Sequence, residues 1–419
     1  MAIFTDLPPE IVSAILRNLD DLRYLAPALL SCRHVYNSYK EFPHIDATVL
    51  CSQVTMALVP YAVAVAEASN LPRPRLENSV CKLLDKLYSD PAKLTEYLWK
   101  MPPNVLRAMV ETHEAVLYFA NSFAANAWDQ ISPENSSTTK LVLSPQEHFR
   151  FYRSFYQIEL FYRLFRGPDP IANGIFRKGM NSWFFWRLPP WVIEQMFSAY
   201  EFFQQTFARA SQDVVAHDID FGEYSIDYLD NTANNGHRHR WLSQGIEFTY
   251  ELINTDCWDD KCDLLKSIYG SDNVNILDAF YDILDDTDID AIEQISLEED
   301  SLIQTFPLDT EDTDRGPLRA WSVVHKDVPR MMLFTDNNDA WLHDRAYVFW
   351  DWDRLQQHNL LELFGGPMMY SKTYPNKEAL DEMFDSFQKR SEIWQKGGSG
   401  YWSKDDTSRI VYPRKKQPV

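Results

Sequence analysis

Basic residues and cysteines are scarce in this sequence. Its 419 residues include 40 Lys and Arg against 61 Asp and Glu, a formal net charge of -21. Because such a chain repels phosphate backbones and anionic lipid surfaces, we expect neither nucleic acid nor a membrane as a partner. An odd, scattered set of cysteines does not form a disulfide framework in a chain of this length, which indicates a reducing compartment. The five are Cys32, Cys51, Cys81, Cys257 and Cys262.

A secretory signal is not expected, because the first ten residues contain neither a basic region nor an apolar core. The expected location is therefore intracellular, in the cytoplasm, the nucleus or both. One stretch, residues 47–66, has 20 residues without a charge, about the length of a membrane span. Pro60 and several polar residues interrupt it, so the sequence favours a buried helix over a transmembrane one.

Familiar catalytic signatures are missing as well. The sequence has no Gly-x-Ser-x-Gly, Gly-x-Gly-x-x-Gly or Walker pattern. Imidazoles and carboxylates do gather in one region, at His217, Asp218, Asp220, His237 and His239. On a helical fold such groups can hold a divalent metal, as in HD-type phosphohydrolases, so a helical metal-dependent hydrolase is an alternative hypothesis. Adjacent arginines and the lack of a nearby upstream histidine argue against it, and no catalytic residue, metal ligand or cofactor is assigned.

Apolar residues recur at intervals of three and four along most of the chain, which predicts a mainly α protein. Strand-like alternation is confined to 321–325 and 346–350. No repeat of fixed period is present, so a solenoid is not expected. The expected helices span residues 9–18, 28–40, 47–69, 76–87, 103–126, 145–166, 190–211, 240–254 and 273–285.

The negative charge is concentrated in one segment. No basic residue occurs between Lys266 and Arg315, a stretch that contains 15 acidic residues. For segment 272–314 we expect a solvated helix face and an acidic loop, with a docking surface for a basic partner as the alternative. Residues 391–419 reverse the sign after a Gly-Ser-rich linker, and are expected to form a flexible basic tail.

The N-terminus contains more apolar surface than it can bury. Leu7, Ile11, Ile15 and Leu19 recur every four residues, so one helix carries an apolar ridge, and paired prolines suit its first turn. Three short helices of about forty residues cannot bury this much Leu and Ile among themselves. The remaining apolar face must therefore pack either on the rest of the chain or on a partner.

These residues resemble the F-box, a three-helix module, and the match covers residues 5–43. Pro27 stands where the family usually has a helix, and Phe42-Pro43 replaces a Trp often found after the third helix. F-box modules bind a small Skp-type adaptor, which links them to a cullin scaffold and a ubiquitin-conjugating enzyme. The resemblance implies an adaptor-binding set of Leu7, Pro8, Glu10, Ile11, Ile15, Leu19, Leu22, Leu25, Leu29, Cys32 and Arg33.

Two later segments resemble recurring features of a large fungal group of F-box-like helical proteins. They are Leu188-Pro-Pro-Trp-Val-Ile-Glu-Gln195 and Arg345-Ala-Tyr-Val-Phe-Trp-Asp351. Asp351 is expected to cap a helix that ends at Gly365. Aromatic clusters usually serve packing, so a core position is expected for Trp191, Tyr347, Phe349, Trp350 and Trp352.

Together these features predict a mainly α chain: an F-box-like module at 1–45, a large irregular helical body at 46–390 and a tail at 391–419. The expected function is that of a non-catalytic substrate receptor in an SCF-type ubiquitin ligase. The module would bind the adaptor, and the body would hold an unknown protein target near the ubiquitin thioester. A stable adaptor complex without ubiquitin transfer is a further alternative.

Overall fold

The computed structural model describes most of the N-terminal module and of the helical body. Residues 217–218, most of 272–293 and most of the basic tail lie outside the described residues, so the predicted helix at 273–285 is described only at positions 276 and 279. The described residues are 6–73, 75–131, 141–166, 184–185, 187–215, 219–221, 224–226, 236–268, 276, 279, 294–326, 340–365 and isolated positions between 378 and 412.

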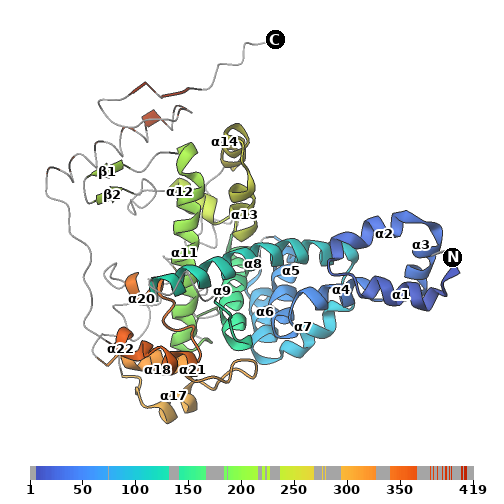
Figure 1. Ribbon diagram of the computed structural model, residues 1–419, viewed down its shortest axis with the longest axis horizontal. Coiled ribbons are helices and arrows are strands. Elements are labelled where there is room, and N and C mark those ends of the chain that lie inside the picture. Colours follow the sequence, from blue (N-terminus) through green and yellow to red (C-terminus); the bar gives the residue numbers. More distant parts are fainter. Residues whose placement is uncertain are drawn as a thin grey trace.

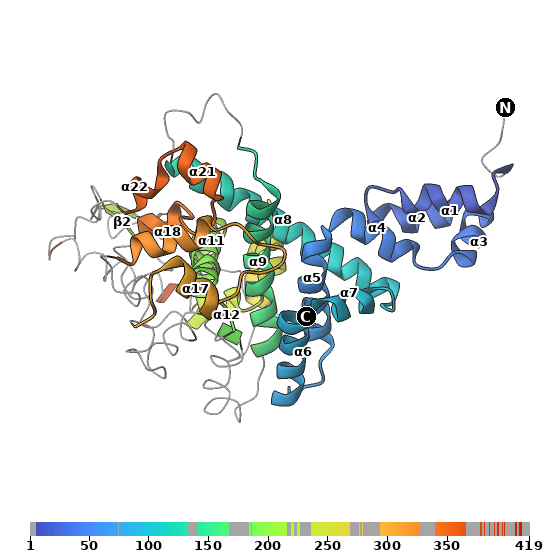
Figure 2. The same cartoon turned by 90° about the horizontal axis from the view of Figure 1, so that it is seen from below.

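The described chain is mainly α, as predicted, and starts with short helices that project from the body (Figure 1 and Figure 2). These are α1 (Pro9–Arg17), the 3-10 helix η2 (Leu22–Tyr24), α2 (Leu25–Ser31) and α3 (Arg33–Glu41). The predicted helix at 28–40 divides at Cys32, whose backbone is extended with φ -161°. Pro27 is accommodated in the first turn of α2, where backbone N–H groups need no intrahelical acceptor. Helix α1 packs against α3.

The uncharged stretch at 47–66 belongs to two helices. Helices α4 (Ile45–Gln53) and α5 (Val59–Asn70) are separated by extended Val54 and the 3-10 helix η3 (Met56–Leu58). Within the described chain no single helix has the length and apolarity to cross a membrane, and this pair, bent by 104°, meets those criteria only when combined. Helix α5 is buried over most of its length.

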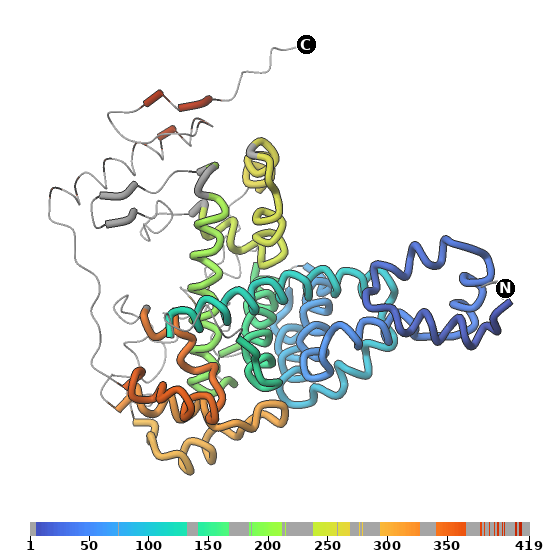
Figure 3. Tube along the Cα trace, in the orientation of Figure 1, coloured from blue at the N-terminus to red at the C-terminus, as the bar shows by residue number. Residues whose placement is uncertain are grey.

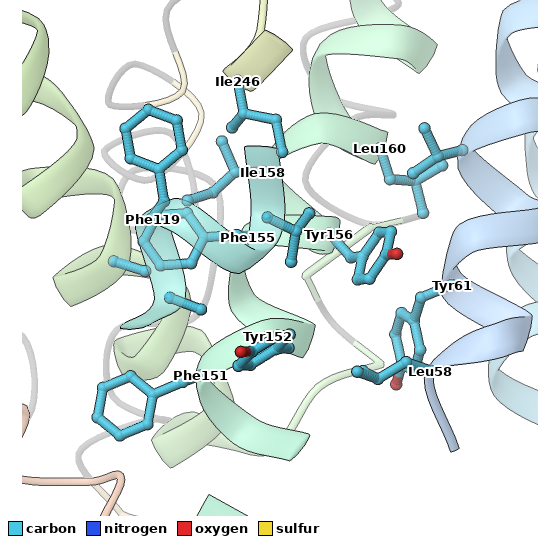
Figure 4. Packing of buried hydrophobic residues seen from close by; sticks show 14 of the residues in the cluster. Leu58, Tyr61, Phe119, Phe151, Tyr152, Phe155, Tyr156, Ile158, Leu160 and Ile246 are labelled. Atoms are coloured by element: carbon cyan, nitrogen blue, oxygen red, sulfur yellow. The ribbon is translucent and has the colours of Figure 1, made fainter. Parts of the chain in front are cut away.

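Helix α9 lies at the centre of the body and packs against α5, α8 and α11. Phe119 of α8 stacks on Phe155 of α9 with ring centroids 5.7 Å apart, while Tyr61 of α5 lies on another side of α9 (Figure 4). Because neighbours surround it, α9 is buried along nearly its whole length, charged residues included. The surrounding elements are α6 (Glu77–Ser89), α7 (Pro91–Leu98), α8 (Pro103–Ile131), α9 (Pro145–Phe165) and α11 (Pro190–Val215).

The C-terminal half consists of shorter elements. The predicted helix at 240–254 is broken at Gly245, whose φ of 96° favours glycine. The only sheet among the described residues is an antiparallel pair, β1 (Ile219–Phe221) and β2 (Tyr224–Ile226). Figure 3 shows the last helices at the opposite end of the molecule from α1–α3. The helices are α12 (Gly236–Leu242), α13 (Ile246–Asn254), α14 (Trp258–Ser267), α17 (Glu299–Thr305), α18 (Gly316–Val324), α20 (Ala340–Asp344), α21 (Trp352–Gln357) and α22 (Leu360–Phe364).

Both predicted strands are wrong. Residues 321–325 belong almost entirely to α18, which starts at Gly316 and directs Leu318, Trp321 and Ser322 inward at helical spacing. Residues 346–350 form turns in which every side chain is buried, so their apolar run reflects full burial rather than one face of a sheet. The expected core positions of Trp191, Tyr347, Phe349 and Trp350 are confirmed, while Trp352 is only partly buried.

Candidate functional site

Helix α1 presents an apolar face to solvent. Ile11 and Ile15 are 48% and 42% exposed, whereas Val12 and Leu16 are 0% and 3% exposed. The two pairs face different directions, because residues four apart lie close together on a helix surface, whereas adjacent residues are about 100° apart around the axis. The apolar residues of α1 therefore divide into an inner pair, Val12 and Leu16, which belongs to the core, and an outer pair, Ile11 and Ile15, which is about half exposed.

The predicted adaptor-binding residues divide into three groups. Pro8, Glu10, Ile11, Ile15 and Arg33 are exposed, and Leu7, Leu19, Leu29 and Cys32 are partly buried. Leu22 and Leu25 are buried, so they face this chain rather than solvent. The backbone N–H of Leu22 donates a hydrogen bond to Gln53 Oε1 at 3.1 Å, which explains its inward position.

Three further exposed apolar side chains of the unit are not in the predicted adaptor-binding set. Leu30 is 87% exposed, and Tyr24 and Tyr36 are also largely exposed. Leu30 adjoins the Leu29 position of the F-box resemblance, but its exposure depends on how α2 is rotated against α3. The resemblance could therefore have pointed to Leu30 as well. It could not show whether Leu29 or Leu30 faces solvent.

Polar contacts fix the three-helix unit to the body. Arg23 donates to both oxygens of Glu114 on α8, at 2.8 and 2.9 Å, and also to Asp21. Hydrogen bonding from Arg23 lowers the pKa of the Asp21 carboxyl below its ordinary value, against the opposing effect of burial. The Tyr39 hydroxyl donates to Asp46 on α4 at 2.7 Å. These bonds connect two of the unit's elements, η2 and α3, with two helices of the body, α8 and α4.

Arg150 is the centre of a buried ionic cluster. It is fully buried, donates from Nη2 to Asp312 Oδ1 at 2.6 Å, and from Nη1 to Asp351 Oδ1 at 2.7 Å and to the Phe349 carbonyl at 2.9 Å. Burial alone would lower the pKa of its guanidinium, but the surrounding carboxylates raise it above its ordinary value. Burial raises the pKa of Asp351, although the charge of Arg150 opposes that rise.

Asp351 occupies the position before α21 but does not cap it. Its side chain makes no capping hydrogen bond. It accepts instead from Arg150 and from the Ser144 hydroxyl, so the prediction of a helix cap at Asp351 is wrong. Nearby, the buried Glu147 accepts from Arg354 Nε and Nη2 at 2.6 and 2.7 Å. The segment around Asp351 is thereby attached to the first turn of α9.

The two segments with fungal resemblance meet in a second buried polar cluster. Glu194 Oε1 accepts from Trp321 Nε1 at 2.7 Å and lies 2.9 Å from His325 Nε2, while its Oε2 accepts from the Tyr347 hydroxyl. Gln195 donates to the Val348 carbonyl at 2.7 Å. The polar residues beside the aromatic motifs therefore join α11 to the C-terminal segments.

A pocket with a volume of about 790 Å³ opens beside α9. Its walls come from η3, α5, α6, α7, α9, the start of α11 and residues 307–314. Arg153 and Gln157 reach it from α9, and Tyr88 reaches it from α6. No sequence pattern predicts this pocket, because its lining residues are dispersed from position 56 to position 314.

Part of the acidic segment is folded and paired. Glu299 accepts from Arg315 Nη1 at 2.7 Å and from Arg319 Nε at 2.9 Å. Hydrogen bonding from Arg319 lowers the pKa of Glu299 despite partial burial. Asp312 pairs with Arg150, so these acids hold the body together rather than facing a partner. Residues between 280 and 293 lie outside the described chain.

Most of the suggested metal ligands lie outside the described residues. These are His217, Asp218 and the side chains of Asp220 and His237. Elsewhere in the described chain, no group of three or more His, Cys, Asp or Glu side chains is arranged to hold a metal ion.

Comparisons with known proteins give no assignment. Neither the models of protein families, nor the curated proteins, nor the solved structures contain a match to this chain.

Proposed function

We propose that this protein is a substrate receptor of a ubiquitin ligase, bound to a Skp-type adaptor through α1–α3. The observation that carries the proposal is the pair of half-exposed isoleucines, Ile11 and Ile15, on a helical unit that projects from the body (Figure 2). Exposed apolar side chains at helical spacing are the usual anchors of helix-in-groove recognition. Because the same residues resemble the F-box, the proposed groove is that of a Skp-type adaptor.

The division of α1 into two faces supports this interpretation. Val12 and Leu16 already provide the unit with its own core, so the unit does not need Ile11 and Ile15 to fold. Burying a fully exposed Ile contributes about 1.5–3 kcal/mol, so two half-exposed ones contribute about 2 kcal/mol together. Binding surfaces typically obtain most of their free energy from a few such residues.

The proposed mechanism is proximity. The adaptor connects the chain to a cullin, and the body holds a target near the ubiquitin thioester, which raises the effective concentration of its lysines. The receptor then contributes no catalytic side chain.

The test is co-purification of the full chain with a Skp-type adaptor. The double variant I11D/I15D should lose the adaptor while keeping its helical circular-dichroism signal. Leu76→Asp is the matched control, since Leu76 is 62% exposed and lies outside the three-helix unit. The proposal is contradicted if the double variant and the parent chain recover equal amounts of adaptor. It is also contradicted if the parent chain recovers none. A cullin in the same complex separates ubiquitin transfer from a plain two-protein assembly.

A further inference from the structure

Four arginines gather at the C-terminal end of α9. Arg163 lies in the last turn of this helix and Arg166 follows it as the C-cap, while Arg73 and Arg75 belong to the connection between α5 and α6. Arg75 Nη1 donates to the Arg166 carbonyl at 2.8 Å, and its Nη2 donates to the Ala68 carbonyl at 3.4 Å. These bonds hold the connection between α5 and α6 against the end of α9.

Only one of the four arginines has counter-ions in the described chain. Arg163 donates from Nε to Glu159 Oε1 at 2.5 Å and from Nη2 to Glu247 Oε2 at 2.8 Å. No carboxylate of a described residue forms an ion pair with the other three. Four arginines therefore stand against two carboxylates. Two positive charges remain at this end of the helix, in a chain whose net charge is -21.

The charges of these arginines act on one another. Burial, followed by the charges of Arg73, Arg166 and Arg163, lowers the pKa of Arg75 to about 10. Burial and the charge of Arg163 also lower the pKa of Arg166, against the opposing effect of Glu159. The positive charges thus lie close enough together to attract one bound anion jointly.

Arg166 has an open edge with two free donors. Its Nη1 donates to Gln244 Oε1 at 2.9 Å and to the Ser243 carbonyl at 3.2 Å. Its Nε and Nη2 donate to no group of the described chain, and solvent can reach them. Two parallel N–H groups on one guanidinium match two oxygens of a phosphate or carboxylate. The exposed side chain of Arg73 supplies a second free guanidinium nearby.

Packing explains the positions of these arginines only in part. Arg75 and the Nη1 of Arg166 satisfy carbonyls at the ends of helices, a usual role of arginine at a C-terminus. That role uses neither the open edge of Arg166 nor the side chain of Arg73. An oxyanion with two negative charges would engage both and would balance the two remaining positive charges.

We propose that the end of α9 binds a phosphoryl dianion, held by the Nε and Nη2 of Arg166 and by Arg73, with Arg75 and Arg163 adding positive potential. The source of this group is either a phosphorylated side chain of another protein or a free phosphate compound, and the experiment below separates the two. The inference does not depend on the proposed function, because the site contains no residue of the three-helix unit.

The probes are inorganic phosphate, acetate and two short peptides that differ only in the phosphorylation of one serine. Binding to the full chain is measured by calorimetry at constant ionic strength and about pH 8, where phosphate groups are mainly dianions. At least one phosphoryl probe should bind about tenfold more tightly than acetate and the unphosphorylated peptide. A phosphopeptide that binds more tightly than phosphate identifies a modified protein as the source, and one that binds no more tightly identifies a free phosphate compound. If neither phosphoryl probe binds, or if acetate binds as tightly, the proposal is overturned.

Two variants locate the binding. Arg166→Met removes the open edge and should weaken binding of the phosphoryl probe about tenfold or more. Arg73→Gln removes one exposed charge and should weaken binding about threefold, with an unchanged unfolding midpoint. Arg107→Gln is the matched control, because Arg107 is exposed on α8, and it should bind like the parent. Unchanged affinity in both site variants, or the same loss of affinity in the control, would contradict the proposal.

Discussion

Replacing Arg150 by Met tests whether the buried ionic cluster holds the C-terminal segments on α9. The substitution keeps the length of the side chain but removes its charge and its donors. It leaves Asp312, which is 6% exposed, and Asp351 as carboxylates without their buried counter-ion, and it leaves the Phe349 carbonyl without a donor. All three acceptors remain inside the protein.

The expected loss follows from these contacts. Breaking a buried ion pair by removing one partner costs about 3–5 kcal/mol, because the other charge is left desolvated. An unpaired buried carbonyl adds about 1 kcal/mol. A loss of about 4 kcal/mol is a large part of the 5–15 kcal/mol that typically separates folded from unfolded protein. We therefore expect Arg150→Met to lower the unfolding midpoint strongly.

The assay is chemical unfolding followed by circular dichroism and tryptophan fluorescence, with Arg23→Met as the control. The Arg23 side chain is 50% exposed, so its ion pairs with Glu114 and Asp21 should together contribute less than the buried pairs of Arg150. In Arg150→Met the two carboxyl groups gain protons more readily when folded than when unfolded. The loss relative to the parent should thus be larger at pH 7 than at pH 5. Equal effects of the two substitutions at pH 7 would refute the reasoning.

Three other outcomes can be measured in the same way. Burial lowers the pKa of His113 to about 4, so the unfolded chain binds more protons than the folded chain between that pH and about 6.5. From pH 7 to pH 5 the free energy of unfolding of the parent should therefore fall by about 2 kcal/mol more than that of His113→Gln. Parallel pH profiles of the two proteins would contradict this. Gly245→Ala should lower the free energy of unfolding by about 3 kcal/mol or more, because φ is 96° at this position and the new Cβ meets the buried carboxylate of Glu159. A variant with the melting temperature of the parent would disprove this. Val12→Asp should melt the three-helix unit, whereas Ile11→Asp should change the melting temperature little; the reverse order would show that the two faces of α1 are misassigned.

Sequence patterns predicted the long helices well, for a local physical reason. Pro103, Pro145 and Pro190 each begin one of the three longest helices of the described chain, at a position where the missing N–H of proline has no cost. The buried aromatic motif around Phe349 also follows from composition, whereas the spacing of Ile11 left open whether it faces the chain or a partner. These features depend on neighbours within a few residues, so one sequence suffices to predict them.

The errors arise where distant residues decide the conformation. Asp351 was expected to cap its own helix, but Arg150, 201 residues earlier in the chain, attracts its carboxylate. The run at 346–350 looked like a strand because full burial and strand formation favour the same residue types. The pocket was not predictable at all, because its lining residues come from many elements between positions 56 and 314 and no local pattern brings them together.

The bonds from Leu22 to Gln53, Arg23 to Glu114 and Tyr39 to Asp46 have a consequence for the choice of modified residues. They fix the direction in which the three-helix unit extends from the body. Under the proposed function, a bound target is then presented to the conjugating enzyme in one orientation, so only lysines on one side of the target can be reached. Loosening this junction should widen the set of lysines that receive ubiquitin and slow transfer to each, because a flexible connection spreads the same target over a larger volume.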